Sequence, residues 1–344
     1  MKYLITGGAG FIGSHLTDAL LEQGHHVHAF DNLSTGRLAN VQHLDDHDRF
    51  SLTVGNVQDY HTLEKCVVEC DRIVHLAAAV GVQRIMDQPV ETLQTNVGGT
   101  ENVLQLAHYH DKKTLLASTS EVYGKAMDKD DDLEALSEED DWTLGPTSKR
   151  RWAYACSKAL DEFLAQAYHD EHDLPVIAAR FFNTVGPRQS GRYGMVIPRF
   201  VERALAGEPI EVYGDGTQTR CFTHVADAVR AVQGLLEAPG TEGEVFNVGQ
   251  GTELSINELA ERVRTLADSN SEIVRVPYEE VYGPGFEDMK RRTPDVSKLR
   301  TATGYEPQHT IDDILRDVIA FMTETEDSKP AHNRESVTSM SPPS

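Results

Sequence analysis

The sequence predicts an α/β protein built on a doubly wound parallel sheet, with a smaller C-terminal lobe. Short apolar runs alternate with segments of helical spacing over the first third of the 344 residues. A glycine-rich turn lies between the first apolar run and the first helical segment, and Gly and Pro become frequent from Thr184 onward. Alternating strands and helices form a parallel sheet with helices on both faces, and irregular Gly- and Pro-rich chain is typical of a separate lobe.

The elements of the first half follow from these patterns. Strands are predicted at the apolar runs Lys2–Thr6, His26–Phe30, Ser51–Val54, Arg72–Leu76 and Lys113–Ala117. Apolar residues recur at helical spacing between them, in Phe11–Gln23 (ended by Gly24), Tyr60–Glu69 and Val90–His110. Further along, the pattern predicts a long amphipathic helix and then a buried strand, at Arg150–Tyr168 and Pro175–Phe181.

The remaining chain is less regular. The acidic run Asp128–Asp141 predicts a solvated loop. We expect Glu244–Val248 to be a strand that returns to the sheet and Ile311–Thr325 to be a C-terminal helix. Ser328–Ser344 is rich in Ser and Pro and lacks apolar spacing, which predicts disorder. The predicted units are therefore residues 1–182, residues 183–326 and a disordered tail, 327–344.

Charge and composition exclude several classes of protein. The chain has 55 Asp and Glu against 32 Lys and Arg, a formal net charge of −23. Such a charge repels phosphates, so we expect neither nucleic-acid nor membrane partners. The sequence contains no apolar run of about 18 residues, so no transmembrane helix is predicted. The excess of acid with scarce Lys fits a halophilic protein or an ordinary acidic enzyme, and both interpretations stay open.

Cysteine usage and the N-terminus favour a cytoplasmic protein. The four Cys are too few for a disulfide scaffold. Cys66 and Cys70 form a CxxxC pattern with no second pair nearby, so no metal site is predicted. The N-terminal segment starts a strand at once and lacks the pattern of a signal peptide.

The glycine-rich turn predicts a dinucleotide site. Gly7, Gly10 and Gly13 form GxxGxxG between a strand and a helix, in the stretch Gly7-Gly8-Ala9-Gly10-Phe11-Ile12-Gly13. Glycine is needed where the backbone turns tightly and approaches a pyrophosphate at a helix N-terminus. We expect Asn56-Val57 after the third strand to contact adenine, and the small Leu76-Ala77-Ala78 after the fourth to let the cofactor pass near the backbone.

Asp31 indicates which dinucleotide binds. It ends the second strand, 18 residues after Gly13. A carboxylate there accepts hydrogen bonds from a ribose 2′-hydroxyl and repels a 2′-phosphate, which favours NAD over NADP. Two alternatives stay open: Asp31 caps its own turn up to Gly36, or the nearby Arg37 accommodates NADP.

A catalytic pair follows on the long predicted helix. Tyr154 and Lys158 are spaced i, i+4 and so share one helix face. A phenol with a pKa of about 10 is a poor base at neutral pH. A neighbouring ammonium and a nicotinamide cation favour the phenolate, so we expect them to lower the pKa of Tyr154.

Support comes from Ser118-Thr119-Ser120-Glu121 after the fifth strand. The carboxyl ends of parallel strands are where such folds bind ligands, so these hydroxyls and this carboxylate are expected near Tyr154. A helix N-cap is the structural alternative.

Together these motifs resemble the extended short-chain dehydrogenase/reductases that act on nucleotide sugars. The resemblance covers roughly residues 2–325 and rests on TGGAGFIG, DNLSTG, HLAA, TNVGGT, STSEVYG, YACSK, RFFNTVGPR, GDGTQTRCFTHVAD and RRTPD. It implies a Rossmann-type NAD-binding domain over 1–182 and a substrate-binding lobe over 183–326. It also implies a catalytic triad of Thr119, Tyr154 and Lys158, with Asn96 as a supporting residue. Further cofactor contacts are expected from Asn32, Ser34, Thr35 and Gly36.

Within this superfamily the chain is most similar to UDP-glucuronate decarboxylases. The stretch Thr119-Ser120-Glu121 occurs in decarboxylases and GDP-mannose 4,6-dehydratases, whereas dTDP-glucose 4,6-dehydratases carry Asp where Ser120 stands. The segments 145–154, 220–223 and 282–288, the last followed by Arg292, resemble the decarboxylase branch. Asn56 departs from the Asp that is common at the adenine contact.

The resemblance implies a mechanism. Tyr154 takes the proton of the C4 hydroxyl while C4 hydride passes to NAD+, and the C6 carboxylate β to the new ketone leaves as CO2. Thr119 hydrogen-bonds the developing oxyanion. Glu121 and Ser120 orient the C5 substituent and manage its proton. The product is UDP-xylose after re-reduction, or the released 4-keto pentose.

Substrate contacts are also implied by the resemblance. Arg220 pairs with the substrate carboxylate or with the diphosphate, and both assignments stay open. Asn183 and Arg292 hold the diphosphate, and the uracil and ribose lie near Val196, Ile197 and Tyr213.

Three other functions are kept as alternatives: a UDP-sugar 4-epimerase, an NDP-hexose 4,6-dehydratase and a non-catalytic NAD-sensing protein. Finally, the helices expected at about 89–110 and 149–168 resemble those of the family's four-helix bundle, which implies a homodimer.

Overall fold

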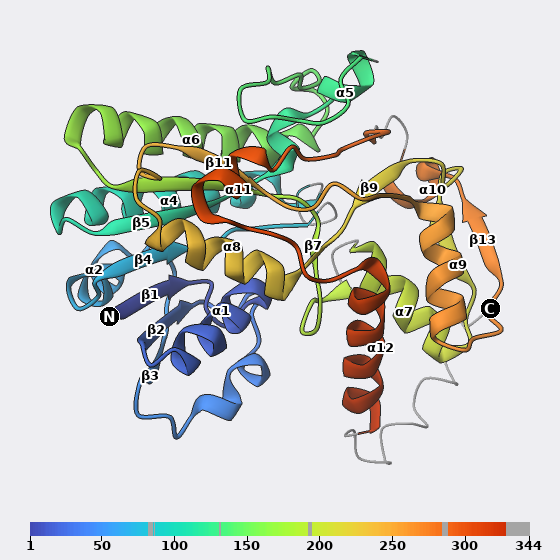
Figure 1. Cartoon of the computed structure of the whole chain (residues 1–344), viewed down its shortest axis with the longest axis horizontal. Helices are drawn as coiled ribbons and strands as arrows, with labels where there is room; N and C mark the ends of the chain where they lie inside the picture. The colour runs from blue at the N-terminus through green and yellow to red at the C-terminus, as the bar shows by residue number, and fades with distance from the viewer. Residues whose placement is uncertain (82–84, 86, 131, 192–194, 284–287, 328–344) are drawn as a thin grey trace, which may run out of the picture.

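The protein is described by a computed structural model over residues 1–81, 85, 87–130, 132–191, 195–283 and 288–327. A seven-stranded sheet organises its larger part, in the order β11-β6-β5-β4-β1-β2-β3 (Figure 1). Every pairing in it is parallel. The strands are β1 (Lys2–Thr6), β2 (His26–Asp31), β3 (Phe50–Val54), β4 (Arg72–His75), β5 (Lys113–Thr119), β6 (Val176–Phe181) and β11 (Val245–Val248).

The strand order reverses between β1 and β4. From β1 the chain moves outward through β2 to β3, then returns to β4 on the other side of β1 and continues outward through β5 and β6. Crossovers that leave in opposite directions from neighbouring strands open a crevice at the carboxyl ends of those strands. The doubly wound parallel sheet predicted from the sequence is confirmed.

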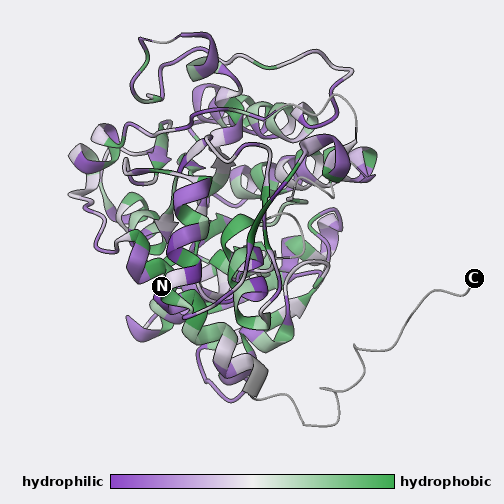
Figure 2. Cartoon of the chain, turned by 90° about the vertical axis from the view of Figure 1, so that its right-hand side faces the viewer, coloured by the Kyte–Doolittle hydropathy of each residue, from purple (hydrophilic) through white to green (hydrophobic). Residues whose placement is uncertain are grey.

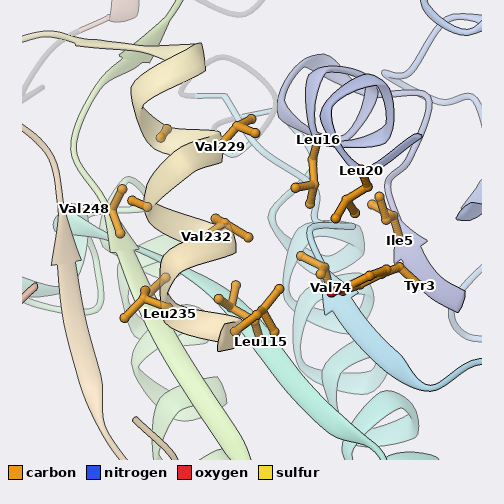
Figure 3. Packing of buried hydrophobic residues seen from close by; sticks show 14 of the residues in the cluster. Tyr3, Ile5, Leu16, Leu20, Val74, Leu115, Val229, Val232, Leu235 and Val248 are labelled. Carbon is orange, nitrogen blue, oxygen red and sulfur yellow. The ribbon is translucent and has the colours of Figure 1, made fainter. Parts of the chain in front are cut away.

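Alternate residues of the strands serve two cores, one on each face of the sheet. Tyr3 and Ile5 of β1 pack with α1 (Phe11–Glu22) and α8 (Val225–Glu237), as Figure 3 shows. Leu4, between them, points into the opposite core with α2 (Tyr60–Val68), α4 (Pro89–Tyr109) and α6 (Trp152–His172). Side chains of a strand alternate between faces, so burial of both sets requires helices on both sides.

A separate core stabilises the C-terminal lobe. Here α7 (Val196–Ala206), α9 (Ile256–Leu266) and α12 (Ile311–Asp327) pack together, on the right of Figure 1. Short paired strands connect the lobe: β7 (Thr184–Val185) with β10 (Thr223–His224), β8 (Ile210–Tyr213) with β13 (Ile273–Val276), and β9 (Thr219–Cys221) with β12 (Glu253–Ser255). The division at residue 182 stays a prediction, and β11 from the second segment joins the main sheet, as expected.

Several boundaries differ from the predicted ones. Strand β5 runs two residues beyond Ala117, to Thr119. Helix α6 begins at Trp152 instead of Arg150 and continues to His172, because Asp173 ends it in the left-handed conformation (φ 54°). The predicted disorder of Ser328–Ser344 lies outside the described residues.

The prediction that Asp128–Asp141 is a solvated loop is wrong in part. The short helix α5 (Ala126–Lys129) overlaps its start, and Leu136 is 1% exposed. The Leu136 amide donates to Thr293 O (2.8 Å), and the Glu138 carboxylate accepts a hydrogen bond from the Asn247 amide (2.7 Å). An apolar residue inside an acidic run is enough to anchor it, so charge alone was a poor guide here.

Hydrophobic segments are concentrated inside the fold and hydrophilic ones at its periphery (Figure 2). Among the helices that the structure describes, none combines the length and apolarity needed to cross a membrane. The other described helical segments are η1 (Leu38–Asn40), η2 (Gln42–Leu44), η3 (Ser120–Tyr123), α10 (Tyr278–Tyr282) and α11 (Ser297–Thr303).

Candidate active site

A cavity of about 310 Å³ lies at the carboxyl ends of the central strands. It contains the reversal point between β1 and β4, where the fold is expected to bind ligands. Most residues predicted to contact a dinucleotide line it: Gly7, Gly10, Phe11, Ile12, Gly13, Asp31, Asn32, Ser34, Thr35, Asn56, Val57, Leu76, Ala77, Ala78, Tyr154 and Lys158. Gly36 and Asn96 do not line it.

The glycine turn fits a pyrophosphate. Gly7 has φ +74°, and a Cβ there would lie 2.9 Å from the Ala77 amide nitrogen. A Cβ on Gly13 would lie 2.2 Å from Gly7 O, so the start of α1 packs directly on the turn. Gly10 caps α1 without a side-chain hydrogen bond, which leaves the amides of the first turn available to an anion.

Asp31 anchors this turn and also faces the cavity. Its carboxylate accepts hydrogen bonds from the amides of Ala9 (3.0 Å) and Leu33 (2.7 Å). Burial raises its pKa, against the effect of these backbone donors. A Cβ on Gly36 would lie 2.7 Å from Asp31 Oδ2, so Gly36 makes room for the carboxylate from behind. The two interpretations of Asp31, turn anchor and cavity wall, therefore apply together.

Asn96 is buried beneath the cavity wall. Its side-chain oxygen accepts from the Ala79 amide (2.7 Å), and its amide donates to Ser157 Oγ (3.2 Å). It therefore ties the segment after β4 to helix α6, next to Lys158. This placement agrees with a supporting role.

A second cavity of about 400 Å³ opens between the sheet and the C-terminal lobe. Thr119 and Tyr154 line both cavities, so a molecule in either one reaches the phenol. Every predicted substrate or catalytic residue apart from Lys158 lines the second cavity: Thr119, Ser120, Glu121, Tyr154, Asn183, Val196, Ile197, Tyr213, Arg220 and Arg292. Thr119 ends β5 and caps η3, because its Oγ1 accepts from the Glu121 amide (3.2 Å).

The pKa of Tyr154 departs from our expectation. Burial raises it, and the negative charges of Glu121 and Asp161 raise it further, whereas a hydrogen bond with Thr119 and the charge of Arg292 lower it. Lys158 Nζ lies 2.8 Å from Asp161 Oδ2, so a carboxylate offsets much of the ammonium's charge. The protein groups alone therefore do not produce the lowered pKa that the YxxxK spacing predicted.

Charged side chains alternate along the wall of the second cavity. Arg292 pairs with Glu121 and donates to Asn183 Oδ1 (2.8 Å). Arg151 lies between Glu121 (3.0 Å) and Asp288 (3.3 Å). Burial opposes ionisation of Glu121, but Arg292 and Arg151 outweigh it and hold its pKa at about 2. Glu121 is thus a carboxylate at any working pH.

The row continues toward the lobe. Arg220 Nη2 lies 3.0 Å from Asp288 Oδ1, and the Tyr278 hydroxyl lies 3.1 Å from Asp288 Oδ2. At the far end the Arg199 guanidinium lies 3.7 Å from the centre of the Tyr213 ring. The Tyr213 ring and the Arg199 guanidinium suit a nucleoside base and ribose. The other three arginines of the cavity suit a diphosphate.

Sequence reasoning missed Arg151, Asp288, Arg199 and Asp161 as site residues. Arg151 and Asp288 lie within stretches that carried the resemblance, but no chemistry was assigned to them. Pairing between residues 137 positions apart follows only from the fold. Arg151 is one helical turn before Tyr154, which was the available signal.

The chain is similar to known proteins that act on UDP-linked uronates. The chain is 42% identical over 94% of its length to a UDP-N-acetyl-alpha-D-glucosaminuronate decarboxylase from Bacillus cytotoxicus, of which it covers 98%. It is 37% identical over 93% of its length to UDP-glucuronic acid decarboxylase 1 of Xenopus tropicalis, of which it covers 72%. A UDP-glucuronic acid 4-epimerase from Bacillus cereus, solved with UDP-glucuronic acid and NAD, superposes with a TM-score of 0.83. That structure shares 30% identity, over 94% of this chain and 100% of its own.

The family comparison covers nearly the whole described fold. The family model described as GDP-mannose 4,6 dehydratase matches residues 4–318, from the first strand to the last helix. Family members with this fold are solved with NAD bound. The chain therefore belongs to the GDP-mannose 4,6 dehydratase family, within the extended short-chain dehydrogenase/reductases that modify nucleotide sugars.

Proposed function

We propose that the chain is an NAD-dependent decarboxylase of a UDP-linked uronate, with UDP-glucuronate as the first substrate to test. One observation carries the proposal: Arg151, Arg220 and Arg292 converge on the cavity that also holds Tyr154. A UDP-uronate has a diphosphate and a carboxylate to pair with such cations, whereas a UDP-hexose lacks the carboxylate. The similarity to two uronate decarboxylases supports the same choice.

Several groups that line the smaller cavity are suited to binding the cofactor. The amides at the start of α1 and the glycine turn would hold the pyrophosphate, and Asp31 would accept from the adenosine ribose. Lys158, which lines this cavity, would donate to the nicotinamide ribose. NAD+ bound there supplies the hydride acceptor for C4 of the sugar and a positive charge that lowers the pKa of Tyr154.

The chemical steps use groups on the shared wall. Tyr154 Oη takes the proton of the C4 hydroxyl as this carbon is oxidised. The C6 carboxylate, now β to a ketone, leaves as CO2, and its bonding electrons delocalise onto the ketone oxygen. Thr119 Oγ1 donates a hydrogen bond to that oxygen. Protonation at C5 and reduction at C4 then give UDP-xylose, unless the 4-keto pentose leaves first.

The two arginines that pair with Glu121 make it a poor proton donor or base. Because its pKa is about 2, it carries no proton to deliver and is a weak base. We propose that it orients Arg151 and Arg292 and accepts a hydrogen bond from the sugar, while Ser120 is the hydroxyl beside C5. A 4,6-dehydratase would use Glu121 to remove the C5 proton, and the test below distinguishes that alternative by its product.

Two further alternatives are outcomes of the test. A 4-epimerase would use Tyr154 without breaking a carbon–carbon bond, and the UDP-glucuronic acid 4-epimerase of Bacillus cereus, which has this fold, is the precedent for that outcome. A non-catalytic NAD-binding protein would have no need for Tyr154 and Lys158, which are both present and line the cavity.

The experiment is incubation of the pure protein with UDP-glucuronate, UDP-N-acetylglucosaminuronate, UDP-glucose and GDP-mannose, followed by mass spectrometry. Loss of CO2 from a uronate supports the proposal, and the comparison of the two uronates identifies the preferred one. Loss of water from a hexose indicates a dehydratase, and an isomer of unchanged mass indicates an epimerase. Tyr154→Phe is the control, since it leaves the cavities lined but removes the proton acceptor.

We also propose that the protein works as a cytoplasmic homodimer. Four apolar side chains on α4 and α6 are exposed: Val90 (66%), Leu93 (38%), Leu160 (45%) and Phe163 (64%). The two helices pack on one another, so these side chains lie on a helix pair that a second copy would extend to a four-helix bundle.

A further inference from the structure

Lys158 and Asp161 form a buried ion pair on α6, and the proposed reaction assigns no role to Asp161. Their side chains are 3% and 0% exposed, and Nζ lies 2.8 Å from Oδ2. Lys158 lines the cofactor cavity, but Asp161, one turn further along α6, lines neither cavity. Asp161 can therefore act on the reaction only through its partner.

We propose that Asp161 is a positioning residue that fixes the ammonium of Lys158 at the floor of the cofactor cavity and limits its effect on Tyr154. This inference rests on the proposed function. An ammonium has three donors. Asp161 accepts from one of them, which leaves two donors for the ribose hydroxyls of a cofactor in the cavity that Lys158 lines.

A chain of polar side chains from α4, β4 and β1 extends from this pair. Burial raises the pKa of Asp161, while the adjacent Lys158 ammonium and the Thr100 hydroxyl of α4 oppose this rise and favour the charged carboxylate. Behind it, His75 of β4 bridges Thr100 (Nε2 to Oγ1, 3.3 Å) and Thr6 of β1 (Nδ1 to Oγ1, 2.7 Å). Thr6 Oγ1 also accepts from the Ala77 amide on the cavity wall (3.3 Å). The arrangement links the floor of the cavity to the central strands.

The surrounding charges show why Asp161 matters electrostatically. Burial, followed by the charge of Lys158, lowers the pKa of His75 to about 3, so this imidazole is neutral near pH 7. Glu162, the next residue, is paired with Arg180 of β6 (2.8 Å). Its charge is therefore largely neutralised and has the smallest of the named effects on the pKa of Asp161. Asp161 is thus the carboxylate that offsets Lys158.

On the side of the phenol, Tyr154 faces Thr119, Glu121 and Arg292 from the other wall. The negative charge of Asp161 reaches Tyr154 as well and opposes formation of the phenolate. Replacing Asp161 by Asn keeps an oxygen near Nζ but removes this charge. The phenolate should then form at lower pH.

The first test compares Asp161→Asn with Glu162→Gln. Both variants neutralise a buried carboxylate of α6 that pairs with a cation, but Glu162 pairs with Arg180 and accepts a hydrogen bond from Ser118, and does not pair with Lys158. We expect the acid limb of the pH profile of kcat to shift down by about one pH unit in Asp161→Asn, a tenfold change in proton affinity. Glu162→Gln should lose stability without moving the limb.

The second measurement does not depend on turnover. Phenolate absorbance is titrated in NAD+-loaded protein, and the same titration of the matching Tyr154→Phe variant is subtracted. The Tyr154 midpoint should be about one pH unit lower in Asp161→Asn than in the parent protein. If no uronate is decarboxylated, the proposed function fails but this titration still tests Asp161.

A third variant covers the case that Asp161→Asn does not fold. Thr100→Val keeps the volume of the side chain and removes the hydroxyl that favours the charged form of Asp161, so the midpoint should move the same way by a smaller amount. Coinciding midpoints in the parent protein and the folded variants would overturn the proposal. An equal shift in Glu162→Gln would do so too, since the effect would then be general to the helix.

Discussion

Arg151 donates a hydrogen bond to Glu121, Nη2 to Oε2 at 3.0 Å, and both side chains line the larger cavity beside Tyr154. Three arginines of this cavity, Arg151, Arg220 and Arg292, each pair with a carboxylate of the protein, Glu121 or Asp288. A substrate with several negative charges must compete with those carboxylates for the same guanidinium groups. A chain with a net charge of −23 can nevertheless bind an anion, because Arg151, Arg220 and Arg292 line the same cavity.

Glu121→Gln is expected to remove decarboxylation and to spare cofactor binding. Gln cannot neutralise Arg151 and Arg292, so both guanidinium groups lose their alignment toward the sugar. We expect kcat on UDP-glucuronate to fall at least about 100-fold, with an unchanged NAD+ dissociation constant in calorimetry, since Glu121 does not line the smaller cavity. Full activity in the variant would show that Glu121 has no role in the reaction.

The low pKa of Glu121 predicts a pH dependence of stability. Its folded-state pKa of about 2 lies below the ordinary value of 4.5, so the charged carboxylate favours the folded state above pH 4.5. That contribution is lost as the pH falls toward 2. Urea unfolding should show the parent protein more stable than Glu121→Gln by about 3 kcal/mol at pH 7, with the difference shrinking below pH 4.5. A constant difference would contradict the assigned pKa.

Arg220→Ala decides between the two anions that Arg220 could bind. Arg220 is separated from Glu121 and Tyr154 by Asp288 and Arg151, which favours the diphosphate end of the cavity. We therefore expect the dissociation constant of UDP itself to rise about 10- to 100-fold, as loss of a charged hydrogen bond does. Unchanged affinity for UDP with weaker binding of UDP-glucuronate would assign Arg220 to the carboxylate.

The matched control is Arg291→Ala. This neighbouring arginine pairs with Glu253, is 42% exposed and does not line the cavity. Its removal should leave UDP binding as it is, so that an effect of Arg220 cannot come from charge alone.

Asp31→Asn tests the cofactor preference. Asn retains one oxygen for the amides of Ala9 or Leu33 but loses the charge that repels a 2′-phosphate. Calorimetry should show NAD+ binding about tenfold weaker and NADP+ binding stronger than in the parent protein. Asp59→Asn, at the exposed N-cap of α2, should change neither affinity. Equal loss of both cofactors would mean that Asp31 only supports the turn.

The sequence predicted the sheet and the cofactor cavity well because local patterns determine both. Lys2–Thr6 is a strand with the predicted bounds, and the glycine turn needs only its own few residues to bring Gly7 against Gly13. The substrate cavity was harder. Asn183, Arg220 and Arg292 came from motif resemblance, while the row from Glu121 through Arg151 to Asp288 depends on where three distant segments meet.

The pKa of Tyr154 shows a second limit of sequence reasoning. The i, i+4 spacing predicted a favourable ammonium, and Lys158 is where the spacing placed it. Its charge, however, is offset by Asp161, and burial dominates. Burial is a property of the packed molecule, so a spacing rule cannot supply it.

Phe163→Asp tests the proposed dimer. Phe163 is 64% exposed on α6 and a charge there would be buried between two copies, where an unpaired carboxylate is costly. Light scattering should give a dimer for the parent protein and a monomer for Phe163→Asp. Val68→Asp, at an exposed apolar side chain (53%) at the end of α2 and outside the α4–α6 pair, is the control and should remain a dimer. A monomeric parent protein would remove the proposal.

Leu136→Ala tests whether the acidic segment is part of the core. Leu136 is buried with Tyr123, Met127 and Phe182, and its backbone bridges to Thr293 and Asp295. Deleting a fully buried leucine side chain costs about 2–4 kcal/mol in unfolding free energy. Denaturant unfolding should show this loss, while Glu139→Ala, three residues away and exposed, should show almost none. Thr293 follows Arg292 directly, so loosening Leu136 should also raise the KM for UDP-glucuronate. A stable Leu136→Ala variant with unchanged KM would show that Leu136 does not anchor the acidic segment, as expected of a solvated loop.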